Sequence, residues 1–344
     1  MAYQQRNIAL DIMKGVGILL MMLCHLVYSE GPVKQFVYSF HMPLFFILAG
    51  IFAKNISDIS SFRQFTIKNA RRLLLPYFVT MLMLCAWGAI QAIAKHDISF
   101  FLRHLFSMLS ASADGWNSHW GLIYAGPMWF LIALFVVREI FVGIQYVCRS
   151  VHEKYRDLLI ISISVALSVI SVYVHPLLPS LPYCIGQAFT AIAFYAIGWY
   201  VHRHAIPWWV YGACVCVWPF AIEYGSVELE SAYIAHYPLS FIGACGGTYA
   251  VYLLCKGIAN LRSLIIHNTS HIIHNIVDIP SPLAWCGLNS LPILCMHEFE
   301  IYSDVYYSVM CRLPVNCERA WGGVIAILFA WVVLRIPYLK EVYK

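Results

Sequence analysis

The chain has 344 residues, of which 61% are hydrophobic and only 11% are charged, whereas a soluble globular protein has roughly 25% charged residues. This composition excludes an ordinary soluble protein and is typical of a chain that crosses a bilayer several times. The net charge of +5 does not predict nucleic-acid binding, because the basic residues are spread over short loops and form no stripe interleaved with aromatic residues. We therefore expect one all-α polytopic membrane domain over residues 1–344.

About ten transmembrane helices are predicted, because the sequence contains ten apolar runs near the 20 residues that a bilayer requires. In chain order these runs cover residues 8–28, 35–53, 73–94, 126–147, 157–175, 183–201, 207–223, 233–255, 283–303 and 320–337. An even number puts both termini on one side, and about 17 of the 22 Lys and Arg residues then lie on that side. Since cytoplasmic loops carry the excess of Lys and Arg, both termini are expected to be cytoplasmic.

The first predicted helix carries three ionisable residues, Asp11, Lys14 and His25, in the run "LDIMKGVGILLMMLCHLVYSE". Each costs several kcal/mol in hydrocarbon unless it has a partner or faces water, so such residues indicate a functional site. Asp11 and Lys14 are three residues apart and can pair on one helix face. Lys14 and His25 are nearly three turns apart, on about the same stripe, with an axial separation of roughly 16 Å.

His41 is expected on the same half of the bundle as His25, because the first two helices are antiparallel and joined by a short loop. A histidine that is merely hydrogen-bonded across helices remains the alternative for a single position, but two histidines in one place favour a site. Close approach of the helix backbones is expected at four small residues, namely Gly15, Gly17, Gly31 and Gly50.

Two predicted external segments combine aromatic and polar side chains. They are residues 95–126, with His96, His104, Trp116, His119 and Trp120, and residues 303–320, with Tyr306, Tyr307 and Arg312. Such side chains suit sugar rings, but Trp and Tyr also anchor proteins at membrane interfaces, and both interpretations stay open. The second segment also holds Cys311 and Cys317, which pair only if that compartment is oxidising.

A histidine-rich stretch near residue 270 has the spacing of metal ligands. His267, His271 and His274 would share one helix face. No Cys and no HExxH pattern lies nearby, so solvated loop histidines are the favoured interpretation and no metal is predicted.

Five motifs resemble those of the membrane-bound acyltransferase 3 family. "LDIMKG" continuing to "CH" is similar to its first-helix signature, and "FHMPLFFILAGIF" to its second, especially in the branch that resembles fucose 4-O-acetylase. "RRLLLPYFV" and "GPMWFL" open the third and fourth helices, and "LNSLPILCMHEFE" lies in the ninth. Lys14 departs from the Arg of many relatives, and a lysine is a point charge without the bidentate fork of arginine.

The resemblance implies transfer of an acetyl or other short acyl group from cytoplasmic acyl-CoA to a hydroxyl of a cell-surface sugar or lipid-linked glycan. Acetyl-CoA is the implied donor, membrane lipid surrounds the chain, and the bacterial inner membrane is the implied location. His25 is expected to be the general base, with an acyl-His intermediate as an open variant. His41 is expected to orient the acceptor or to donate to the oxyanion.

The phosphates of CoA are expected to contact Lys14, Arg71 and Arg72, although both arginines also suit an ordinary role as cytoplasmic anchors. Asp11 is expected to support Lys14. His297 and Glu298, with Glu300 nearby, are candidates to support His25 from the ninth helix.

A transporter of a sugar or a lipid-linked intermediate is the alternative from another class. It also explains many helices with buried charges. Transporters frequently have two matching halves, whereas here the charged motifs are concentrated in the first three helices and the ninth. The sequence therefore favours the enzyme.

Overall fold

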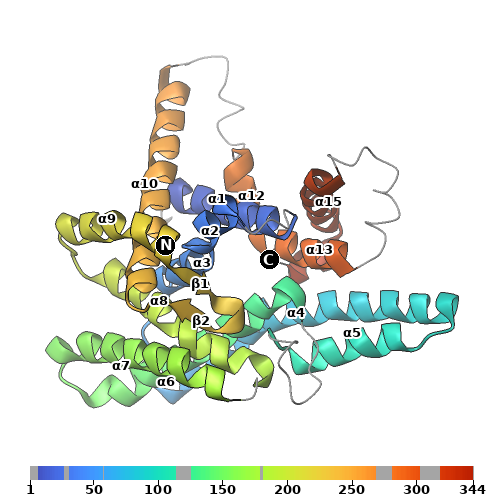
Figure 1. The fold of residues 1–344 in the computed structure, drawn as a ribbon, viewed down its shortest axis with the longest axis horizontal. Coiled ribbons are helices and arrows are strands. Elements are labelled where there is room, and N and C mark those ends of the chain that lie inside the picture. The colour runs from blue at the N-terminus through green and yellow to red at the C-terminus, as the bar shows by residue number, and fades with distance from the viewer. Residues whose placement is uncertain are drawn as a thin grey trace.

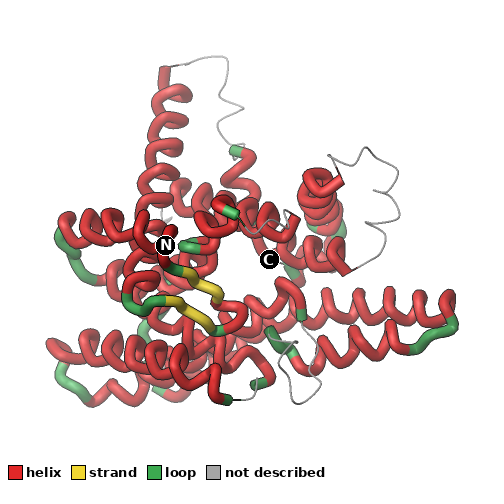
Figure 2. Tube along the Cα trace, in the orientation of Figure 1, coloured by secondary structure: helices red, strands yellow, loops and turns green. Residues whose placement is uncertain are grey.

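A computed structural model of the chain describes residues 7–26, 31–56, 58–113, 125–178, 181–268, 281–302 and 318–343. Helices from both ends of the sequence pack around α1 (Ile8–Leu26), which contacts α3 (His41–Ile51), α10 (Leu239–Asn268) and α12 (Pro282–Leu288) (Figure 1). The described part of the chain is almost wholly helical, and its strands form one short hairpin (Figure 2). The expectation of an all-α membrane fold is confirmed in this form.

The other elements follow in chain order. They are α2 (Pro32–Tyr38), α4 (Ile59–Lys95), α5 (Ser99–Ser110), η1 (Gly126–Met128), α6 (Trp129–Val147), η2 (Cys148–Ser150), α7 (Glu153–Val174), η3 (His175–Leu177), η4 (Pro182–Cys184), α8 (Ile185–Arg203), α9 (Trp208–Tyr224), β1 (Ser226–Glu228), η5 (Leu229–Ser231), β2 (Tyr233–Ala235), α13 (Ser290–Tyr302), α15 (Glu318–Val333) and α16 (Pro337–Val342).

Six helical stretches within the described residues are long and apolar enough to cross a membrane. They cover Ile8–His25, Ile59–Lys95, Gly126–Ser150, Glu153–Leu177, Pro182–Arg203 and Leu239–Leu264. The remaining predicted spans correspond to helices that are shorter or interrupted. The chain is thus a multi-pass membrane protein, while the number ten and the side of the termini stay predictions.

Two predicted spans are each divided into two helices. The run 35–53 becomes α2 and α3, and Ser39 between them donates its hydroxyl to the Phe36 carbonyl at 2.7 Å. The run 283–303 becomes α12 and α13, and Asn289 between them donates its amide to the Trp285 carbonyl at 2.8 Å. In both places a short polar side chain bonds to the backbone and competes with continuation of the helix.

Helix α4 begins 14 residues before the predicted span, because hydropathy does not detect its polar first half. Asp58 caps it by accepting a hydrogen bond from the Ser61 backbone nitrogen at 2.9 Å. Hydrogen bonds from Ser61 and Ser60 lower the pKa of the Asp58 carboxyl to about 2. The following segment was expected to be an external loop, but residues 99–110 form α5, which packs against α4.

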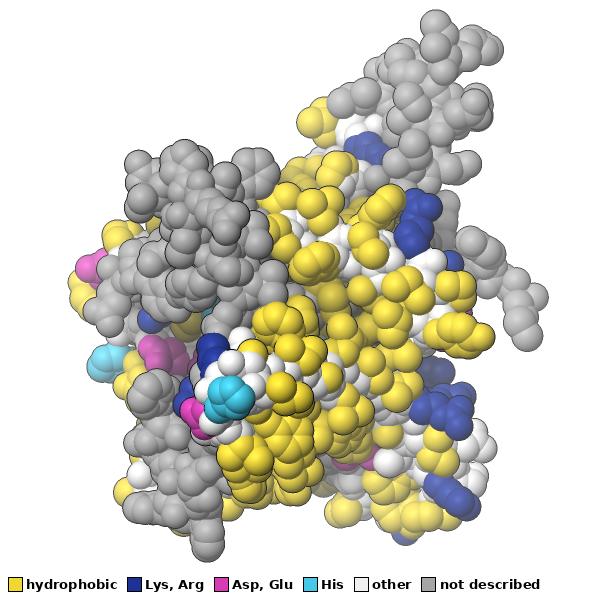
Figure 3. All heavy atoms as spheres, turned by 90° about the vertical axis from the view of Figure 1, so that its right-hand side faces the viewer, with side chains coloured by type: hydrophobic (Ala, Val, Ile, Leu, Met, Phe, Trp, Pro, Cys, Tyr) yellow, Lys and Arg dark blue, Asp and Glu magenta, His cyan; other side chains and the backbone are white. Residues whose placement is uncertain are grey.

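The outer surface of the described helices is largely apolar. Figure 3 shows a broad hydrophobic face with Lys and Arg side chains gathered mainly along its right-hand edge. Exposed large hydrophobic side chains occur on α4, α7 and α15, among them Leu82, Ile170 and Leu328. An apolar face bordered on one edge by cations is the arrangement that a bilayer stabilises.

Two of the four predicted glycine contacts join helix backbones. A Cβ atom on Gly15 would meet the Leu283 carbonyl of α12, and one on Gly50 would meet the Tyr195 carbonyl of α8. Gly17 instead faces the Phe45 side chain, and the prediction is wrong for Gly31, which has no neighbour within 4 Å of its Cβ position. The first contact fixes α1, and with it Lys14 and His25, against α12.

Gly15→Ala is expected to destabilise the protein by about 1–3 kcal/mol, because the added methyl group overlaps a backbone carbonyl that cannot move alone. Gly143 in α6 is the matched control, since nothing lies within 4 Å of its Cβ position. Gly143→Ala is expected to be neutral or stabilising by up to roughly 1 kcal/mol through helix propensity. Thermal unfolding in detergent measures both, and equal effects of the two variants would contradict close packing at Gly15.

Candidate active site

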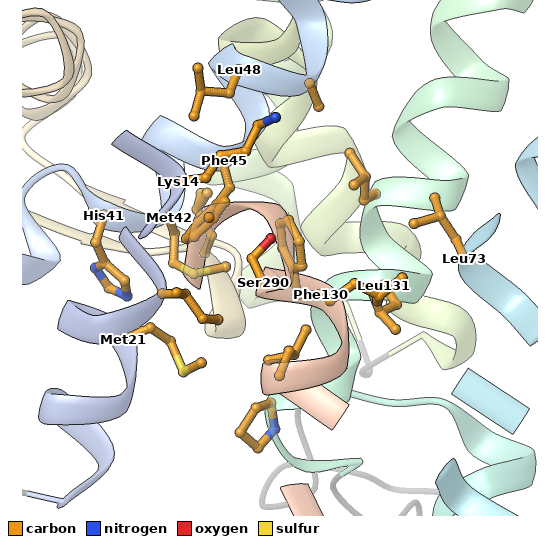
Figure 4. A pocket seen from close by; sticks show the side chains of 18 of the residues that line it. Lys14, Met21, His41, Met42, Phe45, Leu48, Leu73, Phe130, Leu131 and Ser290 are labelled. Atoms are coloured by element: carbon orange, nitrogen blue, oxygen red, sulfur yellow. The ribbon is translucent and has the colours of Figure 1, made fainter. Parts of the chain in front are cut away.

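A cavity of about 850 Å³ runs beside α1 and is lined by both Lys14 and His25. Its volume falls within the roughly 300–1,000 Å³ of small-molecule sites. Figure 4 shows Lys14, His41, Phe130 and Ser290 reaching this cavity from different helices. The two ends of the charged stripe on α1 therefore face one common space.

The end of the cavity near Lys14 is rich in positive charge. We define the basic end as Lys14, Lys54, Arg72 and Arg138, which all line the cavity. The Lys14 ammonium lies 3.6 Å from the Asp11 carboxylate and 5.1 Å from the centre of the Phe52 ring. The predicted pairing of Asp11 with Lys14 is confirmed.

Arg72 and Arg138 lie close enough to repel each other electrostatically. Arg138 also lies over the Phe65 ring, 5.1 Å from its centre. Arg138 is not among the residues predicted from the sequence, although a charged pair, Arg138 and Glu139, interrupts the apolar run of α6 and is a detectable signal. A nearby anion would reduce the repulsion between these two like charges, so this wall suits an anionic ligand.

Glu139, next to Arg138 in sequence, bonds to α4 and does not line the cavity. Its carboxylate accepts hydrogen bonds of 2.6 Å from Thr66 and from Asn69, both on α4. These bonds hold the polar first half of α4 against α6. They therefore fix the relative position of Arg72, on α4, and Arg138, on α6.

The other end of the cavity, which we call the histidine end, is lined by His25, His41 and Tyr38. His25 lies near the end of α1, and its ring centre is 5.6 Å from that of His297 on α13. His297 is fully buried and does not line the cavity. His25 and His297 are thus neighbours, as expected. His25 lines the cavity, and His297 lies behind it, away from the cavity wall.

The tautomer of the neutral His41 ring is fixed by its backbone contact. Its Nδ1 lies 2.9 Å from the Val37 carbonyl oxygen, which can only accept, so Nδ1 carries the hydrogen. Nε2 of the neutral ring then holds a lone pair. The Tyr38 ring packs on the same imidazole with its centre 4.9 Å away. His41 therefore presents an acceptor, not a donor, from this nitrogen.

Glu298 was expected to support His25, but its described hydrogen bond is with η1, directly before α6. Its carboxylate is 1% exposed and accepts a hydrogen bond of 3.2 Å from the Met128 backbone nitrogen. Gly126 has a positive φ of 56° and leaves room for this carboxylate, which any Cβ atom there would meet. Glu298 thus caps the α6 N-terminus, where Pro127 and Trp129 line the cavity.

The structure brings together five of the eight predicted site residues and leaves three elsewhere. Asp11, Lys14, His25, His41 and Arg72 line the cavity. Arg71, His297 and Glu298 do not, and Arg71 is exposed on α4. Asn289 and Ser290 also line the cavity, at the point where α12 ends and α13 begins.

Several residues named from the sequence lie outside the described part of the chain. They are Trp116, His119, Trp120, His271, His274, Tyr306, Tyr307, Cys311, Arg312 and Cys317, and the side chains of His267 and Glu300. In the ranges that the structure does describe, no three His, Cys, Asp or Glu side chains are arranged to hold a metal ion.

Comparison with models of protein families gives a match over most of the chain. The model of a family described as an acyltransferase domain matches residues 7–335. Neither the curated proteins nor the solved structures contain a match to the chain.

Proposed function

The chain belongs to the acyltransferase 3 family, and on that premise we propose that it is an acyl-CoA-dependent O-acetyltransferase of cell-surface sugars or lipid-linked glycans. One observation carries the proposal: a single cavity has cations at one end and two histidines at the other. Acyl-CoA has the matching shape, with phosphates at one end of an extended arm and a thioester at the other. The roughly 16 Å from Lys14 to His25 is a separation that this arm can span.

The basic end is proposed to bind the CoA phosphates and to face the cytoplasm of a bacterial inner membrane. Arg72 and Arg138 suit this task because guanidinium groups bind phosphate oxygens through two parallel hydrogen bonds. Lys14 and Lys54 add point charges beside them. The position of Arg72 on the cavity and of Arg71 away from it favours Arg72 as the phosphate ligand.

His25 is proposed to take the proton of the acceptor hydroxyl while that oxygen attacks the thioester carbonyl. The tetrahedral intermediate then expels the CoA thiolate, which takes the proton back from the imidazolium. The products are the sugar ester and free CoA. An imidazole suits this role because its pKa in water lies near neutrality.

His41 is proposed to hold the acceptor hydroxyl by accepting a hydrogen bond at Nε2. The hydrogen bond from Nδ1 to the Val37 carbonyl supports this role over donation to the oxyanion. His297 is proposed to pack behind the His25 ring and to limit its rotation.

The test is transfer of radiolabelled acetyl groups from acetyl-CoA by the purified protein in lipid nanodiscs, with a panel of methyl glycosides and undecaprenyl-linked sugars as acceptors. The expected result is a labelled sugar ester and one equivalent of free CoA. Uptake of unmodified sugar into proteoliposomes, with no ester formed from any acceptor, would instead support the transporter.

A further inference from the structure

The hairpin of β1, η5 and β2 forms one wall of the cavity at the histidine end. Val227, Glu228, Leu229 and Glu230 all line it. Val227 and Leu229 are buried in the hydrophobic core, whereas Glu228 is exposed and Glu230 is half-buried. The two carboxylate-bearing residues are thus the least buried members of this wall.

The hairpin is held rigidly on α8. Gln187 donates to the Glu230 carbonyl at 2.9 Å, and Thr190 donates to the Ala232 carbonyl at 3.4 Å. Strand pairing places Glu228 opposite Tyr233. In Figure 1 the hairpin lies in the middle of the bundle, next to α2 and α8. The carboxylates of Glu228 and Glu230 are thus presented from a fixed support.

The two carboxylates belong to the same neighbourhood as the histidines. Both act electrostatically on Tyr38, whose ring packs on His41. An independent feature also points to a ligand here: His41 is 4% exposed, and among the described residues its Nε2 has no hydrogen-bond partner although the side chain lines the cavity. A ligand hydroxyl in the cavity can donate a hydrogen bond to this nitrogen.

We infer that Glu228, Glu230 and Tyr38 form the wall of the acceptor site and that this site takes a neutral sugar, bound through its hydroxyl groups. The inference rests on the proposed function and names the acceptor class for it. Carboxylates accept hydrogen bonds from hydroxyl groups and repel a carboxylate or phosphate on the acceptor. The Lys34 ammonium, 5.2 Å from the centre of the Tyr38 ring, partly offsets the two negative charges and reduces the attraction for a cation.

The experiment measures sugar binding without turnover, by saturation-transfer NMR of the full chain in nanodiscs. The probes are the methyl glycosides of glucose and galactose and the matching methyl uronides, which differ only by a carboxylate at C6. Wild type is expected to bind a neutral glycoside at least tenfold more tightly than its uronide. The double variant Glu228→Gln, Glu230→Gln is expected to bind the neutral glycoside about tenfold more weakly and to lose most of this discrimination.

Glu223→Gln is the matched control, since Glu223 is exposed on α9 and does not line the cavity; it is expected to behave as wild type. The inference is overturned if wild type binds no neutral glycoside, binds the uronide equally well, or loses nothing in the double variant. Sugar binding, measured by NMR, and acetyl transfer, measured in the transfer assay, are separate results. Normal sugar binding without any acetyl transfer would therefore count against the proposed function alone.

Discussion

Replacing His25 by Asn is expected to lower kcat for acetyl transfer by about 10²–10⁴-fold, the usual contribution of a general base. Asn keeps a polar side chain of similar length but cannot take a proton near neutral pH. The affinity for acetyl-CoA is expected to stay the same, because the phosphates are proposed to bind roughly 16 Å away at the basic end. Transfer assays and equilibrium binding of labelled acetyl-CoA measure the two quantities separately.

His96→Asn is the control for this substitution. His96 is exposed, lies away from the cavity and has a left-handed backbone conformation that Asn adopts readily. This variant is expected to keep wild-type activity. A His25→Asn protein that folds, binds acetyl-CoA and transfers acetyl at the wild-type rate would exclude His25 as the base.

The sequence predicts the apolar helices well and the polar elements poorly. Hydropathy locates α1, α6, α7 and α8 to within a few residues, because these helices are apolar for most of their length. It does not find the first half of α4, which contains four Lys or Arg residues and is held by hydrogen bonds to Glu139. Hydropathy also misses α5, which is amphipathic, and the short hairpin, because neither has an apolar run near 20 residues.

In the site, too, the sequence predicts residues that lie close together on one helix and misses residues that come from distant elements. The i, i+3 pair of Asp11 and Lys14 and the three-turn spacing to His25 follow from one helix, and the structure keeps both on the cavity. Arg138, Glu228 and Glu230 come from distant elements, so only the packing of α6 and the hairpin reveals them. Glu298 illustrates the reverse case, because its place next to His297 in sequence suggested a contact with His25, whereas its carboxylate caps α6.

The charges of the cavity are also divided between its ends. Four cations and Asp11 line the basic end, while Glu228 and Glu230 line the wall near the histidines. A polyanionic donor is thus attracted at one end and repelled at the other. Under the proposed function this separation orients the donor, since the pantetheine arm with its thioester carries no charge and can approach the acidic wall without a penalty.

Removing the charge of Arg72 gives the second large effect that we expect. A hydrogen bond between charged groups contributes about 1.5–3 kcal/mol, so Arg72→Gln should weaken acetyl-CoA binding roughly 10–150-fold, and Arg138→Gln by a similar factor. Isothermal titration with acetyl-CoA measures the loss. Arg63→Gln on the same helix is the control, because Arg63 is exposed and does not line the cavity; Arg71→Gln is expected to resemble it.

Acetyl-pantetheine separates a lost phosphate contact from a damaged fold, because it carries the thioester and the arm but no phosphate. Wild type and Arg72→Gln are expected to use acetyl-pantetheine with equal kcat/KM. Arg72 is proposed to act on the donor only through the CoA phosphates, and acetyl-pantetheine has none. If Arg72→Gln lowers kcat/KM equally for both donors, Arg72 supports the structure of the cavity instead of binding phosphate. If Arg71→Gln has the larger effect on acetyl-CoA, the phosphates bind outside the cavity, and the proposed course of CoA from the basic end to His25 is wrong.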